Sequence, residues 1–311
     1  MRTAEYEEMM AKAWPWTKAF ERQLSRLRAK PFSGSHLMFG SDYSGDHRNS
    51  RFKVYGFVIA NAETSQNWPV RVGLVRKEFL KDGRRMSFKS MNDGHRRRAL
   101  VPFLEASEAL DGHVVVVVVT KELTWLTGSP TSMEQWHGSP GLKARWDHSA
   151  FEEMTRVAHF FSLLVGAWSS PDMHISWFTD DDVIVANEDR LDDMHLLTAK
   201  VSSFYVKHQL GEFMFNRVSA APENRAFEDF LAIPDLAAGM FSETLSSRTK
   251  HSDQPDNRLR IDAYLSEKSE VISSWFAHSQ GTLKKTCILI DKKPDGRFGI
   301  GELQHGEPDW A

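Results

Sequence analysis

Cysteine is almost absent from this chain of 311 residues, because Cys287 is the only one. A single cysteine excludes an intramolecular disulfide and any zinc site built from several thiolates. The surrounding residues, Thr-Cys-Ile-Leu-Ile, have the character of a buried strand, in which a lone thiol behaves as a small apolar side chain. A reducing compartment is therefore expected, and a cysteine nucleophile is disfavoured.

Long apolar runs are also missing. The longest, residues 114–119, is far shorter than the roughly 20 residues that a membrane-spanning helix needs. The N-terminal residues lack the basic start and the apolar stretch of a signal peptide. We therefore predict a cytoplasmic protein that does not enter a membrane.

Several catalytic motifs are absent as well. The 13 histidines include no His-Glu-x-x-His pattern, and the 19 glycines form neither a Walker loop nor a dinucleotide-binding loop. No Gly-x-Ser-x-Gly nucleophile motif occurs. Zinc hydrolases, P-loop NTPases, Rossmann oxidoreductases and serine hydrolases thus have no support in this sequence.

Charge is nearly balanced overall but uneven along the chain. The net charge is −3, yet residues 1–100 hold 20 Lys and Arg against 10 Asp and Glu, and the remainder holds 19 against 32. Such a split is typical of a basic surface for a polyanion beside an acidic region. Two solvated surfaces without a partner would give the same arithmetic, so the charge alone does not decide between them.

Apolar periodicity predicts alternating strands and helices. Three β-rich segments, residues 36–40, 52–60 and 69–77, are predicted to form an antiparallel meander. The run 114–119 has the character of a strand covered on both faces, as in parallel sheets. A further strand is expected at 174–178, and a terminal hairpin at 285–290 and 297–301. Helices are predicted in residues 1–30 (broken near Pro15), 92–110, 147–168, 187–208, 226–245 and 262–278.

The order strand, strand, strand, helix, strand, helix, strand, helix is that of the RNase H-like fold. We therefore predict an α/β protein with a mixed sheet, in which the antiparallel meander is continued by parallel strands and flanked by helices. Residues 36–248 would form this domain. Residues 1–35 would be an N-terminal helical extension, and residues 249–311 a C-terminal helix and β-hairpin packed on the same domain.

Carboxylates occur where a sheet-based metal site would need them. Two divalent cations about 3.5 to 4 Å apart require several converging oxygen ligands. Asp42 ends the first strand, Asp180 to Asp182 follow residues 174–178, and Asp235 lies in an apolar helical stretch where an unpaired charge is costly. Ordinary alternatives stay open for each: turn capping by Asp42 and Asp46, a solvated loop at 180–182, and a helix N-terminal acid at Asp235.

Two of these segments resemble a known family. Asp42-Tyr-Ser-Gly-Asp46 and Ala-Ile-Pro-Asp235-Leu-Ala-Ala-Gly239 are similar to motifs of the bacterial family named domain of unknown function 3800. That family typically has Asp-Glu-Ser-Gly after its first strand, a strand-end Asp in the middle, and a late helix with Ala-Asp-Leu-x-Ala-Gly. The resemblance covers about residues 36–245 and implies an RNase H-like fold with a metal-dependent nuclease site. Tyr43 departs from it, because the family usually has Glu there.

Carried over by position, the resemblance implies that Asp42, Asp180 and Asp235 are the catalytic acids. Together with Asp182 they would hold Mg²⁺ or Mn²⁺, in a site for two metal ions. Asp46, Lys89 and Glu122 are further candidates for a supporting role, Glu122 as a fourth acid. The residues predicted to contact a nucleic-acid backbone without reading its sequence are Arg84, Arg85, Arg96, Arg97 and Arg98.

The sequence thus predicts a metal-dependent nuclease that hydrolyses phosphodiester bonds in DNA or RNA. Two alternatives stay open. One is a catalytically inactive RNase H-like module that binds nucleic acid or a protein partner in a multi-component bacterial system, which Tyr43 and the uncertain fourth acid favour. The other is a phosphohydrolase acting on nucleotides, which would share the metal site. A protein partner or a homo-oligomer is compatible with each of these functions.

Overall fold

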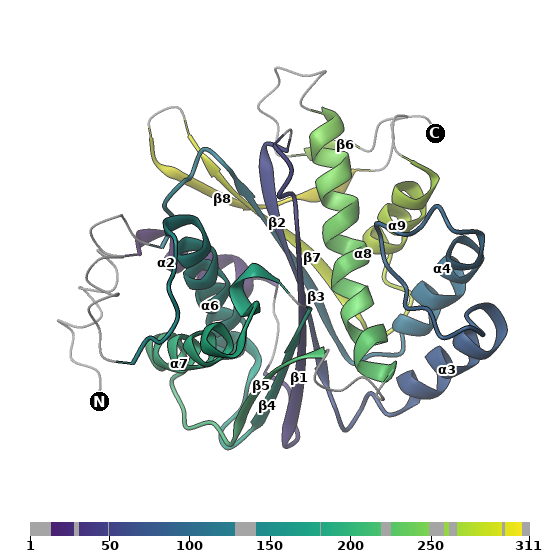
Figure 1. The fold of residues 1–311 in the computed structure, drawn as a ribbon, viewed down its shortest axis with the longest axis horizontal. Helices are drawn as coiled ribbons and strands as arrows, with labels where there is room; N and C mark the ends of the chain where they lie inside the picture. Colours follow the sequence, from purple (N-terminus) through teal and green to yellow (C-terminus); the bar gives the residue numbers. More distant parts are fainter. Residues whose placement is uncertain are drawn as a thin grey trace.

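A seven-stranded mixed sheet runs through the centre of the molecule, with helices on both of its faces (Figure 1). The computed structural model describes residues 14–27, 31–48, 50–127, 141–180, 182–218, 225–248, 258–260, 266–293 and 296–306. The strand order is β5-β4-β1-β2-β3-β7-β8. A second sheet pairs two short strands, β6 (Arg258–Arg260) and β9 (Gln304–Gly306).

The strand directions bring five C-terminal strand ends to one edge of the central sheet. Strands β1 (His36–Ser44), β2 (Phe52–Asn61) and β3 (Gly112–Thr120) form an antiparallel meander. Strands β4 (His174–Thr179) and β5 (Phe213–Arg217) continue it in parallel to β1. On the other side, β7 (Lys284–Lys292) runs parallel to β3, and β8 (Phe298–Glu302) is antiparallel to β7. Consequently β1, β3, β4, β5 and β7 all end at the same edge.

The helices divide between the two faces of the sheet (Figure 1). One face is covered by α2 (Pro15–Arg26), α6 (His148–Trp168) and α7 (Glu188–Tyr205), the last preceded by the single turn η1 (Val183–Val185). The other is covered by α3 (Asn67–Phe79), α4 (Gly94–Ser107), α8 (Arg225–Arg248) and α9 (Glu267–Ala277). Among the described residues, no helix is long and apolar enough to cross a membrane.

Alternating side chains along the central strands supply two separate hydrophobic cores. In β3, Val115, Val117 and Val119 pack on the α6 side, whereas Val114, Val116 and Val118 pack on the α8 side. A strand side chain points to the face opposite its neighbour, so a run of valines fills both cores at once. The prediction that residues 114–119 are covered on both faces is confirmed. This strand is parallel to β7 and antiparallel to β2.

The predicted strand at residues 69–77 is wrong, because this segment lies within helix α3. Val70, Val72 and Leu74 alternate with polar residues, but Val70 and Leu74 are 65% and 63% exposed. The buried face is formed by Trp68, Val72 and Val75, spaced four and three residues apart as on a helix. With Val72, the exposed Val70 and Leu74 therefore produced the alternating apolar pattern that is typical of a strand.

The predicted fold class, an RNase H-like mixed sheet flanked by helices, is confirmed with one change in its strands. The third strand of the meander is β3, and α3 and α4 are a helical insertion between β2 and β3. Strand β5 was not predicted, and it restores the expected order of strands and helices. Helix α2 precedes β1, whereas α9, β7 and β8 follow α8.

The other segments agree with their predictions. The long helix predicted at 147–168 is α6, and the predicted C-terminal hairpin is β7 with β8. Helix α2 begins at Pro15, because proline suits the first helical position but not the interior. Residues 1–13 of the N-terminal extension and the turn residues 294–295 lie outside the described residues. Cys287 is buried on β7, as predicted.

Candidate carboxylate site

Glycines on the central strands allow helix α8 to lie directly on the sheet. Asp42 on β1 pairs in register with Gly56 on β2. A Cβ atom added at Gly56 would come 2.6 Å from the carbonyl oxygen of Pro234, so only glycine permits this approach. Asp235 follows Pro234 directly, and the close approach therefore brings Asp235 to Asp42.

Asp42 and Asp235 form a carboxyl pair. The charges of both Asp235 and Asp180 act on the Asp42 carboxyl, Asp235 more strongly. Burial first, and then Asp235, raise the pKa of Asp42 well above its usual value. The backbone N–H of Tyr43 opposes this shift by donating to Asp42 Oδ1 at 2.9 Å. The repulsion between the two carboxyl groups would be relieved by a proton or by a cation beside them.

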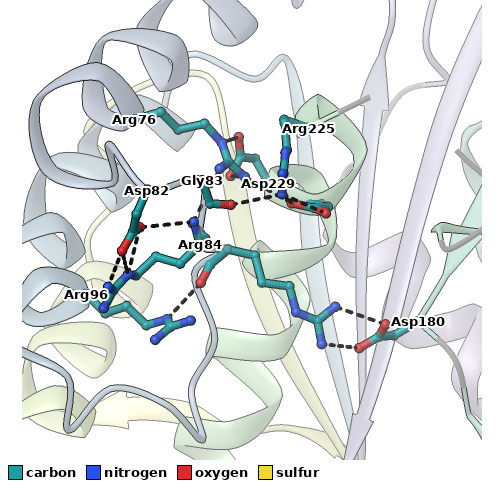
Figure 2. A network of polar contacts seen from close by, with 10 residues as sticks. Arg76, Asp82, Gly83, Arg84, Arg96, Asp180, Arg225 and Asp229 are labelled. Carbon is teal, nitrogen blue, oxygen red and sulfur yellow. Dashed lines mark hydrogen bonds and ion pairs between the residues drawn. The ribbon is translucent and has the colours of Figure 1, made fainter. Parts of the chain in front are cut away.

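Asp180, at the end of β4, is held by Arg85 from the loop between α3 and α4. The two guanidinium nitrogens of Arg85 donate to the two carboxylate oxygens of Asp180 at 3.1 and 3.0 Å, and Figure 2 shows both contacts at Asp180. This hydrogen bonding to Asp180 raises the pKa of Arg85, and the charges of Asp235 and Asp42 add to the shift. Arg85 is therefore a cation that faces all three acids.

Asp235 is fixed by the same loop. The backbone N–H of Phe88 donates to Asp235 Oδ2 at 2.8 Å. Phe88 can reach this position because Gly239, one helical turn after Asp235, has no side chain, and a Cβ there would overlap the Phe88 ring. The Nζ atom of Lys268 on α9 lies 3.8 Å from the centre of the same ring and donates to the Phe88 carbonyl at 3.2 Å.

The backbone of this loop is anchored by arginine side chains. The consecutive carbonyls of residues 83–85 each accept a hydrogen bond, from Arg225 at 2.9 Å, Arg76 at 3.4 Å and Arg96 at 2.8 Å respectively. Arg76 is itself bound in two places by the Asp229 carboxylate of α8, at 2.5 and 2.7 Å (Figure 2). The loop that carries Arg85 is thus tied to both α8 and α4.

A second group of charges lies on the opposite face of the sheet. Lys53 on β2 forms ion pairs with Glu153 of α6, at 3.0 Å, and with Asp46. Glu153 also accepts from the Tyr55 hydroxyl at 3.0 Å. Burial raises the pKa of Asp182, and the nearby charge of Lys53 opposes that shift. Asp46 and Asp182 therefore belong with Lys53, and Asp182 caps η1 by accepting from the N–H of Val183.

Of the acids predicted for the site, the structure brings together Asp42, Asp180 and Asp235. Glu122, just after β3, pairs with Arg51 at 3.5 Å in an exposed position. Asp181 lies outside the described residues. The side chain of Tyr43 points away from Asp42, into the core on the α6 side.

The predicted basic residues are of two kinds. Arg84 pairs with Asp82 and Asp93, and Arg96 pairs with Asp93 at 2.8 Å, so these two arginines help to build the loop. Lys89, Arg97 and Arg98 are exposed around it. The pairing of Arg85 with Asp180 and the N–H of Phe88 were not predicted, because nothing local in the sequence signals contacts between such distant segments.

The site has suitable donors for a divalent cation, but they are not gathered around one point. Within the part of the chain that the structure describes, no three His, Cys, Asp or Glu side chains are grouped so that they could hold a metal ion. Asp180 is engaged by Arg85 instead. The Asp42 and Asp235 pair nevertheless fits a hard cation, because carboxylate oxygens are its preferred ligands and a cation would relieve their repulsion.

Comparisons with known proteins add little. No protein-family model matches the chain, and no curated protein sequence matches it. Among solved structures, ribonuclease H2 from Pyrococcus horikoshii OT3 matches with a TM-score of 0.35 and 12% sequence identity, over 78% of this chain and 85% of that one. Similarity at this level does not establish a relationship, so the resemblance to the domain of unknown function 3800 family stays a prediction.

Proposed function

We propose that the protein hydrolyses phosphodiester bonds of nucleic acid at the carboxylate site, with Mg²⁺ or Mn²⁺ as its cation. The observation that supports this most directly is the position of Asp42, Asp180 and Asp235. These acids come from β1, the end of β4 and α8, and they meet at the edge where the parallel strands end. Phosphodiester hydrolysis by divalent cations requires carboxylates that converge on the cation, and Asp180 would complete this set on leaving Arg85.

Each residue of the site has a distinct part in this proposal. Asp42 and Asp235 would hold the cation, and the N–H groups of Tyr43 and Phe88 each fix one oxygen of these carboxylates. Asp180 would be the third ligand once its contact with Arg85 opens. A divalent cation bound there would activate water and neutralise charge on the phosphate. The exposed Lys89, Arg97 and Arg98 are placed to contact phosphates of either DNA or RNA.

The test is incubation with single- and double-stranded DNA and RNA in Mg²⁺, Mn²⁺ or EDTA. We expect cleavage in one of the metals and none in EDTA. Substitution of Asp42→Asn or Asp235→Asn should lower the rate more than about 100-fold, because each removes a direct ligand. Asp192→Asn is the matched control, since Asp192 is exposed on α7 and pairs with Lys143. Full cleavage by either site variant, or by the wild type in EDTA, would reject the proposal.

A second function, binding of nucleic acid without cleavage, is favoured by the Arg85 and Asp180 ion pair. In this arrangement the acid cluster already has a counter-charge, so a metal is not required to balance it. A binding module would retain nucleic acid with an affinity that falls as salt rises, because released counterions drive such binding. It would show no cleavage in any cation, and D42N would bind as tightly as the wild type.

A further inference from the structure

Arg85 differs from Arg84 and Arg96 in the acid with which it forms an ion pair. Arg84 and Arg96 pair with acids of the loop and of the start of α4. Arg85 instead reaches across to β4 and takes both oxygens of Asp180. The insertion between β2 and β3 therefore delivers a cation to acids that belong to the sheet and α8.

The loop backbone is fixed on both sides of this side chain. The Arg85 carbonyl is bound by Arg96 at 2.8 Å, and three residues later the N–H of Phe88 is bound by Asp235 at 2.8 Å. The Arg85 side chain, by contrast, is 45% exposed, and that of Asp180 is 32% exposed. An ion pair this open to water contributes little to stability. The guanidinium can therefore leave Asp180 without disturbing the backbone that positions Asp235.

A guanidinium and a divalent cation have the same requirement at this point. Both need the carboxylate oxygens of Asp180, and the two positive charges would repel one another across the cluster. Both oxygens of Asp180 accept a hydrogen bond from Arg85, which weakens the binding of a cation to either oxygen. A cation that binds both oxygens of Asp180 would therefore displace the guanidinium from them.

We propose that Arg85 and a divalent cation alternate as the partner of Asp180. Arg85 is then a positioning residue: it holds Asp180 near Asp42 and Asp235 while no cation is bound, and it releases Asp180 when a cation enters. This inference rests on the proposed function, because it places the cation at the same three acids. It adds that Arg85 competes with that cation for the carboxylate of Asp180.

The test is calorimetric titration with Mn²⁺ alone, which needs no nucleic acid. Arg85→Met should bind Mn²⁺ about fivefold more tightly than the wild type, since the competing ion pair is lost. Arg85→Lys keeps the charge but loses the two-pronged contact, and it should fall between them. Lys81→Met removes a positive charge from an exposed position of the same loop and should change the affinity by less than about twofold, because exposed charges are screened. Asp42→Asn should abolish the binding, which locates the cation at this site.

Several results would overturn the inference. An unchanged or weaker affinity in R85M would show that Arg85 does not compete. An equal gain in K81M would show that only the overall charge of the loop matters. If R85M does not fold, R85K provides the test. An Mn²⁺ affinity of R85K no higher than that of the wild type would reject the competition. Mn²⁺ binding in the expected order without cleavage of any nucleic acid rejects the proposed function alone, whereas no Mn²⁺ binding by any variant rejects both.

Discussion

The backbone N–H of Phe88 donates to the carboxylate of Asp235, and this bond joins the helical insertion to the helix that lies across the sheet. Gly239 makes the contact possible, because the Phe88 ring occupies the space that a side chain at position 239 would fill. Gly56 has the same part on the other side of α8, where the carbonyl of Pro234 touches the strand. Two glycines that have no functional side chain therefore determine the position of Asp235.

Substitution of Gly239→Ala should destabilise the fold and lower cleavage together. The added methyl group would force Phe88 away, and overpacking of this kind costs about 1 to 3 kcal/mol. This exceeds the gain of about 0.5 to 1 kcal/mol that alanine gives in a helix. Gly73→Ala in α3 is the matched control, since Gly73 has nothing within 4 Å of a built Cβ, and it should gain stability. Urea denaturation measures both, and equal shifts in the two variants would contradict this explanation.

Tyr43 should be dispensable for cleavage. Its ring lies in the core on the α6 side, and its hydroxyl is 2.9 Å from Ser41 Oγ. Tyr43→Phe removes this hydrogen bond, so we expect a loss of about 1 kcal/mol and a cleavage rate within about twofold of the wild type. Tyr43→Glu restores the residue of the resembling family but would bury a carboxylate near Asp182 and Glu153, and it should unfold the protein. A large rate loss in a folded Y43F would assign Tyr43 a direct part in the reaction.

The sequence prediction included the three acids whose charges act on one another, together with Asp182, Asp46 and Glu122, which lie elsewhere, and the role of all six stays a prediction. Asp42 and Asp180 stand at strand ends, and parallel strands end at one edge of a sheet, so their approach follows from the topology. Asp235 stood out because a carboxylate amid apolar residues needs a partner. The opposite orientation of Tyr43 also follows from strand alternation. Local sequence pattern and the order of strands and helices were therefore enough to predict the positions of these residues.

The contacts that complete the site depend on residues too distant in sequence to be paired by pattern. Arg85 and Asp180 are 95 residues apart, and Arg76 and Asp229 are 153 apart. In these pairs, basic residues of the insertion meet acids that follow β4 or lie on α8. Part of the positive charge in the first hundred residues is thus neutralised inside the protein. The strand predicted at residues 69–77 was wrong for a different reason. Val70 and Leu74 are apolar but exposed, so the apolar residues of this segment did not show the spacing of a helix.

A matched pair of aspartates on α7 should separate structural from surface charge. Asp193 is fully buried and accepts from the N–H groups of Lys143, Ala144 and the Trp146 indole, at 2.7 to 2.9 Å. Asp193→Asn replaces an acceptor oxygen with a donor facing these N–H groups and should cost about 2 to 4 kcal/mol. Asp192→Asn loses only an exposed ion pair with Lys143 and should cost less than about 1 kcal/mol. Denaturation midpoints measure both, and similar losses would argue against the buried network.

Two buried histidines should make the fold sensitive to acid. Burial lowers the pKa of His159 to about 3 and that of His113 to about 4. His159 lies 2.7 Å from the Tyr205 hydroxyl, and His113 stacks on the Trp168 ring. In the unfolded chain both would titrate near pH 6.5. Between about pH 6.5 and 4 the unfolded state therefore carries more protons on these two histidines. Their contribution to the free energy of unfolding falls as the pH falls, by up to about 1.4 kcal/mol per pH unit for each histidine.

Substitution of His159→Asn should remove the contribution of this histidine, up to about 1.4 kcal/mol per pH unit, because Asn retains a polar group near Tyr205 but does not titrate. The variant will be less stable at neutral pH, since the smaller side chain leaves space between Trp14 and Trp16, which the imidazole contacts. The slope between pH 6.5 and 4.5, measured by urea denaturation at each pH, is independent of that offset. His148→Asn, at an exposed position of α6, is the matched control substitution. An unchanged slope in H159N would show that His159 is protonated as readily in the folded protein as outside it.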